Sequence, residues 1–229
     1  EDCRDDWSDD RDEIHCELRT RGRKATGATI SVDGRRNGGV SITGWDRDSI
    51  HIRAMIKTRA RTEDRAKELA GQVQTDLDAA TLAADGPSTS GRDSWWVSYD
   101  IMVPRRSNLS VETVNGPIGV ENVSGRIELE ATNGPIMLTG VGGDVQSRTQ
   151  NGPMVVELTG TKWEGTGLDA STQNGPVQLS IPKNYSAELE TGTHNGPMNF
   201  RIPITVNCEL PNLTDWPIKS LASASSPSR

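Results

Sequence analysis

Residues 115–156 decide the fold, and they read NGPIGVENVSGRIELEATNGPIMLTGVGGDVQSRTQNGPMVV. Within this stretch the triplet Asn-Gly-Pro recurs every 18 residues, and two more copies follow after gaps of 23 and 21 residues. A fixed period of this length is typical of stacked repeats, in which each unit buries its apolar face against the next. The five copies are Asn115-Gly116-Pro117, Asn133-Gly134-Pro135, Asn151-Gly152-Pro153, Asn174-Gly175-Pro176 and Asn195-Gly196-Pro197.

The 18-residue unit divides into two halves of nine residues. Each half opens on a glycine, and apolar residues follow two and four positions after most of these glycines. Because side chains alternate along a strand, these two positions share one face, which predicts a turn and a short strand in each half. Stacking then predicts two interior ladders, one of Ile118, Ile136, Met154, Val177 and Met198 and the other of Val120, Leu138, Val156, Leu179 and Phe200.

The fold predicted from this pattern is mainly β. We expect a single-stranded β-solenoid, similar to a β-helix, with coils of about 18 residues, two strands in each coil and one flanking α-helix. The corner chemistry agrees, because glycine permits the turn, proline is tolerated at the first residue of a strand, and stacked asparagines can hydrogen-bond along the axis. A meander of antiparallel hairpins is the alternative, since Asn-Gly is also a hairpin signal.

Three parts are distinguished by composition. Residues 1–27 form an acidic segment with cysteines, residues 28–204 the β-solenoid domain, and residues 205–229 an irregular tail rich in proline and serine. The sequence Asn37-Gly38-Gly39-Val40 is a degenerate sixth copy of the repeat. A helix is expected over about residues 62–80, where apolar residues have helical spacing, namely Ala66, Leu69, Ala70, Val73 and Leu77.

Two tryptophans are candidates for interaction with a partner. Trp163 lies in an insertion, residues 161–168, that lengthens one repeat, and insertions of this kind often carry the binding face of repeat proteins. The competing interpretation is a loop with Trp163 folded back over a groove. Trp216 lies in the tail after the last repeat.

Charge and hydropathy limit the classes of partner. The 229-residue chain has a net charge of −7 and 33% hydrophobic residues, so a nucleic-acid partner is not expected. Acidic residues gather between Glu1 and Glu17, which indicates a solvated tail or, alternatively, a segment that binds calcium or a basic partner. No transmembrane segment is recognised, and the first residue is not methionine, so we expect an extracytoplasmic protein, periplasmic or at the cell surface, with its leader already removed.

The cysteines are consistent with that location. Cys3 and Cys16 stand at either side of the acidic run, and in an extracytoplasmic protein they are the expected disulfide. A metal site that includes His15 is the competing interpretation. The third cysteine, Cys208, stands near the start of the tail, and its redox state is left open.

The order of motifs over roughly residues 3–204 resembles a bacterial family called "putative adhesins". That resemblance implies an extracytoplasmic β-solenoid domain of unknown function. This chain has Asn-Gly-Pro where similar proteins tend to have Asn-Gly-Gly or Ser-Gly-Asp, and its tail replaces their closing glycine-rich strand, which would leave a strand edge open for pairing. The motifs that carry the resemblance are His15-Cys16-Glu17-Leu18-Arg19, Asn37-Gly38-Gly39-Val40 with Gly44-Trp45-Asp46, the alanine-rich helix, Trp96–Pro104, the Asn-Gly repeats and Trp163–Asp169.

These features predict a non-catalytic structural or interaction protein of the cell envelope, without metal or cofactor. We expect an envelope scaffold or an extrinsic accessory subunit docked on a larger membrane-associated assembly, or alternatively a free adhesin-like surface protein. A carbohydrate-active enzyme would need paired carboxylates, for which Glu128 with Glu130 and Glu188 with Glu190 are the candidates. A calcium-loaded β-roll would need Asp in every turn, and only Gly143-Asp144 resembles this.

Overall fold

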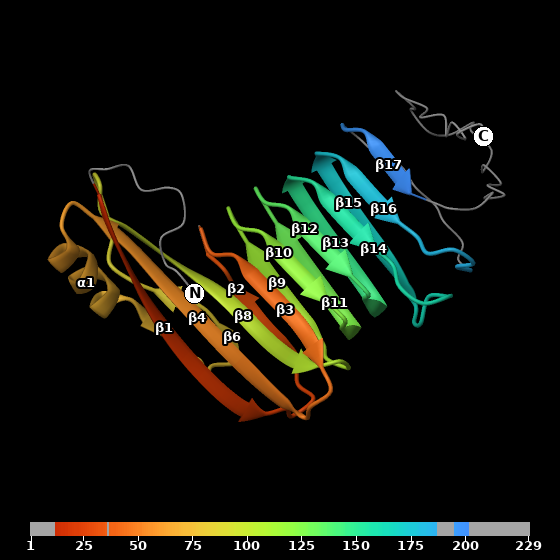
Figure 1. Ribbon diagram of the computed structural model, residues 1–229, viewed down its shortest axis with the longest axis horizontal. Coiled ribbons are helices and arrows are strands. Elements are labelled where there is room, and N and C mark those ends of the chain that lie inside the picture. The colour runs from red at the N-terminus through yellow and green to blue at the C-terminus, as the bar shows by residue number, and fades with distance from the viewer. Residues whose placement is uncertain (1–11, 36, 187–194, 202–229) are drawn as a thin grey trace.

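A computed structural model describes residues 12–35, 37–186 and 195–201 of the chain (Figure 1). Over these residues it contains one α-helix and seventeen β-strands. The strands assemble into sheets of nine, six and two strands. The predicted ladder residue Phe200 lies in the last described strand, whereas Trp216, Cys3, Cys208 and the tail 205–229 lie outside the described residues.

The sheets are mixed, so the prediction of a single-stranded β-solenoid is wrong. The nine-stranded sheet contains, in spatial order, β1 (Glu13–Lys24), β4 (Ser49–Ala60), β8 (Ser94–Pro104), β3 (Val40–Trp45), β10 (Ile118–Glu121), β12 (Ile136–Thr139), β14 (Met154–Glu157), β16 (Val177–Ser180) and β17 (Met198–Arg201). The six-stranded sheet contains β15 (Gly167–Asn174), β13 (Gly142–Asn151), β11 (Ser124–Ala131), β9 (Leu109–Thr113), β2 (Ile30–Asp33) and β6 (Thr81–Leu82). Two short strands, β5 (Gln74–Thr75) and β7 (Ala84–Asp85), form the third sheet.

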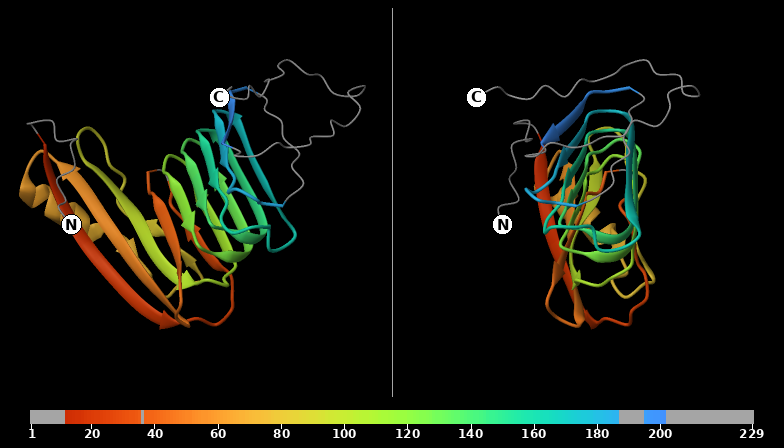
Figure 2. Two further views of the ribbon diagram at one scale, coloured as in Figure 1. Left: turned by 45° about the vertical axis from the view of Figure 1, so that its right-hand side comes forward. Right: turned by 90° about the vertical axis from the view of Figure 1, so that its right-hand side faces the viewer.

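The antiparallel part is what overturns the predicted fold class. Strand β4 pairs antiparallel with both β1 and β8, and these three strands extend away from the stack toward the helix (Figures 1 and 2). Strand β4 alternates buried and half-buried residues over its whole length, as an antiparallel strand with one covered face does. The same alternation occurs in parallel and in antiparallel strands, so the sequence pattern did not reveal the antiparallel pairing.

Within the repeats, in contrast, the pairing is parallel, which excludes the hairpin meander there. The register joins Ile118 to Ile136, Ile136 to Met154, Met154 to Val177 and Val177 to Met198, as the first predicted ladder requires. The degenerate copy takes part as well, because Val40 lies opposite Ile118. The 18-residue period therefore fixes the register of the stacked strands even though it does not give the whole architecture.

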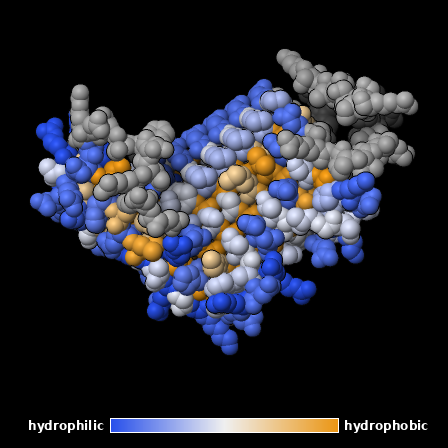
Figure 3. Space-filling model, viewed as in Figure 1, coloured by the Kyte–Doolittle hydropathy of each residue, from blue (hydrophilic) through white to orange (hydrophobic). Residues whose placement is uncertain are grey.

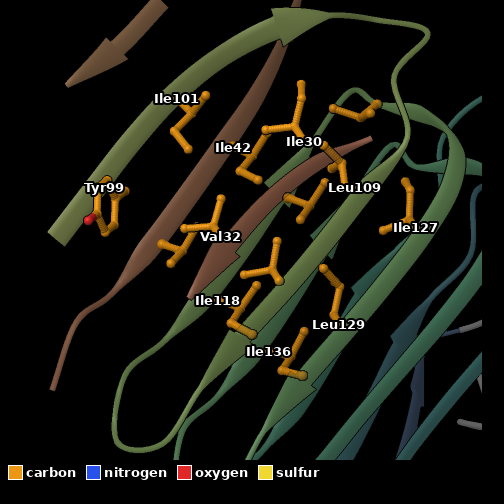
Figure 4. Packing of buried hydrophobic residues seen from close by; sticks show 14 of the residues in the cluster. Ile30, Val32, Ile42, Tyr99, Ile101, Leu109, Ile118, Ile127, Leu129 and Ile136 are labelled. Atoms are coloured by element: carbon orange, nitrogen blue, oxygen red, sulfur yellow. The ribbon is translucent and has the colours of Figure 1, made fainter. Parts of the chain in front are cut away.

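The nine-stranded and six-stranded sheets face each other across a thin core of aliphatic side chains (Figure 4, and the view along the stack in Figure 2). Three buried hydroxyls at the edge of that core are satisfied at the corners of the repeats. The buried hydroxyls of Thr113, Thr149 and Thr172 each donate a 2.9 Å hydrogen bond to a corner carbonyl, that of Gly116, Gly134 or Gly152 respectively. A buried hydroxyl paired in this way costs far less than an unpaired one.

The helix α1 (Glu63–Gln72) covers one side of β1 and β4 and is shorter than the predicted range of 62–80. The hydroxyl of Thr62 caps its start by accepting a hydrogen bond from the Arg65 N–H. After its end, the segment 73–79 lies against arginines that project from the inner face of β1. Arg19 donates to the Val73 carbonyl at 2.9 Å, Arg21 pairs with Asp78 at 2.8 Å, and Arg23 donates to the Asp78 carbonyl at 3.1 Å.

This row of arginines also explains how β1 ends the sheet. Charged side chains that point inward are one of the devices by which an edge strand avoids pairing with another chain. In the described part of the chain, β1 has β4 as its only strand neighbour. A stacked repeat would not predict the arginines, because the inner positions of its strands are apolar.

Tyr99 stands apart from the aliphatic core around it. Its side chain is 2% exposed, and its hydroxyl has no hydrogen-bond partner in the described structure. Burial, with a smaller contribution from Asp33, raises the pKa of the Tyr99 phenol above its usual range. The pKa of Tyr185 is raised as well, chiefly by burial.

We predict that alkaline pH unfolds the protein partly through Tyr99. Its folded pKa lies above the unfolded value of about 10, so its contribution to stability is complete below pH ~10 and is lost as the pH rises further. The Tyr99→Phe variant should therefore resist alkaline unfolding better than the wild type, while at neutral pH its stability should be equal or higher by about 1 kcal/mol, because an unpaired hydroxyl is removed. Denaturant titrations at pH 7 and above pH 10 measure both effects. A variant that unfolds at the same alkaline pH as the wild type would contradict this account.

Candidate interaction surface

The two outer faces of the stacked region differ in chemistry, and each difference follows from strand alternation. Buried residues such as Ile136 and Leu138 leave Met137 between them on the outside of the nine-stranded sheet. On the six-stranded sheet, buried Ile127 and Leu129 leave Glu128 and Glu130 on the outside. The first outer face is poor in charge and the second is rich in it.

An apolar row crosses the outer face of the nine-stranded sheet, and we call it the outer strip. Met137 is 46% exposed and lies opposite Val155, while at the far end Leu18 is 45% exposed and lies opposite Met55. The Asn-Gly-Pro prolines stand one position before the buried ladder residues and so fall on this same face. Figure 3 shows a band of hydrophobic colour that crosses the stacked strands between hydrophilic margins. The outer strip comprises Leu18, Met55, Pro117, Pro135, Met137, Pro153, Val155 and Pro176.

The outer strip is continuous from β1 to β16 because small residues join its two ends. Gly39 lies beside Pro117, whose ring carbon would be 3.2 Å from a side chain at that glycine. On its other side, the backbone carbonyl of Gly39 accepts a hydrogen bond from the backbone N–H of Tyr99. The residue before Tyr99 is Ser98, which pairs with Met55 of β4. The outer strip therefore spans both the parallel and the antiparallel parts of the sheet, and in the antiparallel part the Arg53–Asp100 ion pair, at 3.2 Å, lies on the same face.

The opposite face carries exposed ion pairs. Arg126 binds Glu128 at 2.7 Å, and Arg148 binds Asp169 at 3.2 Å. Exposed pairs of this kind contribute little to stability and mark a solvated surface. The candidate catalytic pair of Glu128 and Glu130 does lie on one strand, but Glu128 is engaged by an arginine. Arg148 lies beside Glu130 in the register and pairs with Asp169. The second candidate pair, Glu188 and Glu190, lies outside the described residues.

Two features hold the first corner of each repeat, namely a series of hydrogen bonds between asparagines and a close stack of glycines. The corner asparagines hydrogen-bond amide to amide through the stack, and we call this the Asn ladder. Its Nδ2 to Oδ1 distances are 3.3, 2.9, 2.8, 2.9 and 3.4 Å along the series Asn37, Asn115, Asn133, Asn151, Asn174 and Asn195. The adjoining glycines stack so closely that a side chain at Gly116, Gly134, Gly152, Gly175 or Gly196 would meet the carbonyl of the preceding corner at 2.0–2.2 Å.

The second corner of the stack forms a polar groove of about 750 Å³ that sequence reasoning did not identify. Strand-to-strand turns from several successive repeats line it, and Asn122 and Gly140 adopt left-handed backbone there, with φ of 56° and 60°. Gly125 and Gly143, nine residues after the corner glycines Gly116 and Gly134, are its sequence signal. Its polar side chains are those of Arg105, Arg106, Ser107, Asn108, Asn122, Ser124, Thr159 and Glu164.

Trp163 is turned inward, as the second interpretation of the insertion proposed. Its indole N–H donates to the Gly143 carbonyl at 3.1 Å, and its ring packs against the core while Glu164 and Gly165 border the groove. The other interaction candidate, Trp216, lies outside the described residues, so it stays a prediction. The Cys3–Cys16 disulfide also stays a prediction, because Cys16, on β1, is described and Cys3 lies outside the described residues.

The part of the chain that the structure describes contains neither a cluster of metal ligands nor a helix that could span a membrane. No three His, Cys, Asp or Glu side chains come together there as the ligands of a metal ion would. The helix α1 is too short and too polar to cross a membrane, and it is the one α-helix in that part of the chain.

The comparisons with known proteins find likeness in structure only. No protein family and no curated protein matches the sequence. A crystal structure of a putative cell adhesion protein from Clostridium sporogenes is similar over 81% of this chain and 99% of its own, with 8% identity and a TM-score of 0.42. That of a putative adhesin from Parabacteroides merdae covers 81% of this chain and 97% of its own, with 8% identity and a TM-score of 0.28. Likeness at this level assigns no function to the chain.

Proposed function

We propose that this protein is a non-catalytic, extracytoplasmic interaction protein, and that it docks as an accessory or scaffold subunit on a larger membrane-associated assembly through the outer strip. The observation that supports the proposal most directly is the contrast between the two outer faces. Over the stacked repeats, one presents Met137, Val155 and a row of prolines with few charges, and the other presents exposed ion pairs. The fully buried centre of a protein interface is likewise depleted in charge.

Part of the outer strip is already rigid before it is covered. Its prolines have no rotamer freedom to lose and Val155 has little, whereas Met55 and Met137 do lose rotamer freedom on burial. The strip lies on a sheet whose opposite side is packed into the core, so its backbone is already ordered. A partner with a flat apolar surface is therefore the expected ligand, in agreement with a subunit of a larger assembly.

Catalysis by the exposed carboxylates is not favoured by their surroundings. A general acid for glycoside hydrolysis needs a pKa raised by an apolar or acidic environment. Glu128 instead forms a 2.7 Å ion pair with Arg126 on an exposed surface, which is not an environment of that kind. This supports the assignment of the charged face as a solvated surface.

We predict that charges on the outer strip abolish binding. The double variant Met137→Glu/Val155→Glu should reduce capture of the partner from detergent-solubilised membranes of the source organism by about 100-fold, because unpaired carboxylates would be buried in the interface. The matched control is Gln146→Glu/Ser171→Glu, which adds the same charge to the outer face of the six-stranded sheet, where both residues are exposed. Thermal unfolding of both variants checks that each is folded. Equal capture by the two variants would rule out the outer strip as the docking surface.

The same assay separates the two forms of the proposal. A defined set of membrane proteins captured by the wild type and the control, but not by the Met137→Glu/Val155→Glu variant, supports the docked subunit. Binding to the surface of other cells without capture from the protein's own membranes would instead support a free adhesin-like protein.

A further inference from the structure

The polar groove at the second corner of the stack takes no part in the function proposed above. We call it the corner groove, and its polar side chains run from Arg105 to Glu164. It lies where the chain leaves β10, β12 and β14, at the arrowhead ends of these strands in Figure 1. A smaller hollow of about 320 Å³ adjoins it, because Gly27, Arg106 and Ser107 line both. No described residue that lines either hollow belongs to the outer strip, so this is a separate surface.

Glycines leave the corner groove open. The turns of successive repeats approach so closely that a Cβ at Gly125 would lie 2.3 Å from the Ser107 carbonyl oxygen, and one at Gly143 would lie 2.1 Å from the Gly125 carbonyl oxygen. Only glycine fits at such a distance, so these positions carry no side chain that could fill the groove. The turns recur along the groove at the spacing of neighbouring strands, about 4.8 Å.

The backbone along the corner groove is already paired. The N–H groups of Ser107 and Ser124 donate to the carbonyls of Ser124 and Arg105, at 3.1 and 2.6 Å respectively. The N–H group of Gly143 donates to the Glu164 carbonyl at 2.7 Å. A peptide that binds as an added strand needs free backbone groups, which these turns do not offer. A ligand in the groove must therefore be bound by side chains.

Some of those side chains have no partner within the described residues. The exposed guanidinium of Arg106 makes no ion pair or hydrogen bond there, whereas the neighbouring Arg105 is held by Asp46 at 2.6 Å. The hydroxyls of Ser124 and Thr159 likewise have no hydrogen bond in that part of the chain. The groove thus presents one unpaired cation together with hydroxyl groups that can both donate and accept.

The insertion supplies a carboxylate at the other end of the corner groove. Trp163 binds the Gly143 carbonyl, and the next residue, Glu164, is exposed and lines the groove. A Cβ at Gly165 would lie 2.3 Å from the Gly143 Cα, so the insertion is packed against the neighbouring turn. Insertions in repeat proteins often carry a binding face. Here the tryptophan fixes the loop, and Glu164 is the residue that can reach a ligand.

These groups fit a ligand that carries both carboxylates and hydroxyls. A guanidinium pairs with a carboxylate through two parallel hydrogen bonds. Val123 is the one apolar side chain among the described residues that line the groove, and it is buried, so an apolar ligand finds little to contact. The recurrence of the turns at about 4.8 Å is close to the length of one sugar unit in an extended polysaccharide.

We propose that the corner groove binds an acidic polysaccharide, a polymer of uronic acids, lying along the stack. Arg106 pairs with a sugar carboxylate, while Ser124, Thr159 and Glu164 bind sugar hydroxyls. Asp48 in the smaller hollow and Glu164 in the larger one repel carboxylates, which places the bound carboxylate between them, at Arg106. The chain has a net charge of −7, so attraction is local and should weaken as salt is added.

The test is isothermal titration calorimetry of the full-length protein at low ionic strength, with polygalacturonate and with dextran as the neutral polymer. Polygalacturonate should bind at least about tenfold more tightly, and Arg106→Gln should weaken its binding about tenfold or more, because a hydrogen bond to a charged group is stronger than a neutral one. The matched control Arg61→Gln removes the same charge from an exposed arginine outside the groove and should leave binding unchanged. Equal affinities of the two variants, or no binding of polygalacturonate, would overturn the proposal.

Poly-glutamate separates recognition of a sugar from attraction between charges. The double variant Ser124→Ala/Thr159→Ala keeps Arg106 and removes two hydroxyls, so it should weaken binding of polygalacturonate by about tenfold and leave binding of poly-glutamate unchanged. If poly-glutamate binds as tightly as polygalacturonate, and the double variant weakens neither, the groove only attracts charge and the assignment to a polysaccharide is wrong.

The Met137→Glu/Val155→Glu variant keeps this proposal apart from the proposed function. It changes the outer strip alone, so it should bind polygalacturonate as the wild type does, whatever its effect on capture of the membrane partner. Loss of polysaccharide binding in this variant, with its thermal unfolding unchanged, would place the polymer on the outer strip and refute the corner groove as its site.

Discussion

Replacement of Gly134 by alanine is expected to destabilise the protein by more than about 4 kcal/mol, a loss large enough to prevent folding of many domains. The added Cβ would lie 2.2 Å from the Gly116 carbonyl oxygen and 2.8 Å from its carbon. Both atoms belong to the backbone of the neighbouring repeat, which is fixed by parallel pairing on either side and cannot move as a side-chain end could. Soluble yield and denaturant unfolding measure the loss.

The matched control is Gly119→Ala, in the same repeat and on the outer face. No atom lies within 4 Å of the position that its Cβ would take, so its stability should change by no more than about 0.5 kcal/mol. A Gly134→Ala protein as stable as Gly119→Ala would mean that the corners do not stack as closely as the structure has them.

The repeats show how much of the fold could be predicted from the sequence. A strand shifted by one residue would turn every side chain to the other face, so the apolar residues at Ile118, Ile136 and Met154 admit one register only. That register is present in the structure. The close approach of the corners could also be expected, because only glycine leaves room for a backbone at that distance.

The antiparallel part could not be predicted in the same way. An alternating strand such as β4 (Ser49–Ala60) buries every second residue whichever way its neighbours run. Its direction depends on connections, namely the turn after β3 and the helix before β8, which the alternating pattern does not encode. The inward arginines of β1 were missed for a related reason. Arg19 and Arg23 bind backbone carbonyls of residues 73–79, which any sequence would supply, and Arg21 binds the Asp78 carboxylate.

The outer strip could have been predicted from the sequence, although the predicted interaction residues lie in the insertion and in the tail. If Ile136 and Leu138 point inward, then Met137 must point outward, and the same argument places Val155 and the prolines on that face. The interaction candidates were instead placed where the repeat is interrupted. In the structure, Trp163 of the insertion donates a hydrogen bond to the Gly143 carbonyl. The polar groove was not predicted because it depends on the left-handed backbone at Asn122 and Gly140, which is set by packing between repeats.

The last prediction concerns Ile101, which joins the antiparallel and parallel parts of the nine-stranded sheet. Its strand β8 pairs antiparallel with β4 and parallel with β3, so Ile101 lies between Ile52 and Ile42, and all three are fully buried. Figure 4 shows Ile101 and Ile42 in this core. Ile101→Ala should cost about 2–5 kcal/mol, because the lost aliphatic contacts leave a cavity that the paired strands cannot close.

The location of the strands that Ile101→Ala destabilises is more informative than the size of the stability loss. If one core serves both parts, as the continuous cluster of buried residues indicates, amide hydrogen exchange should speed up in β4 and in β12 together. Met102→Ala is the control, since Met102 is the next residue of the same strand, points to the outer face and should change stability by far less. Faster exchange confined to β1, β4 and β8 would mean that the repeats form a stable unit of their own. Because the outer strip crosses from β1 to β16, such an independent unit would also divide the proposed docking surface into two separately folding halves.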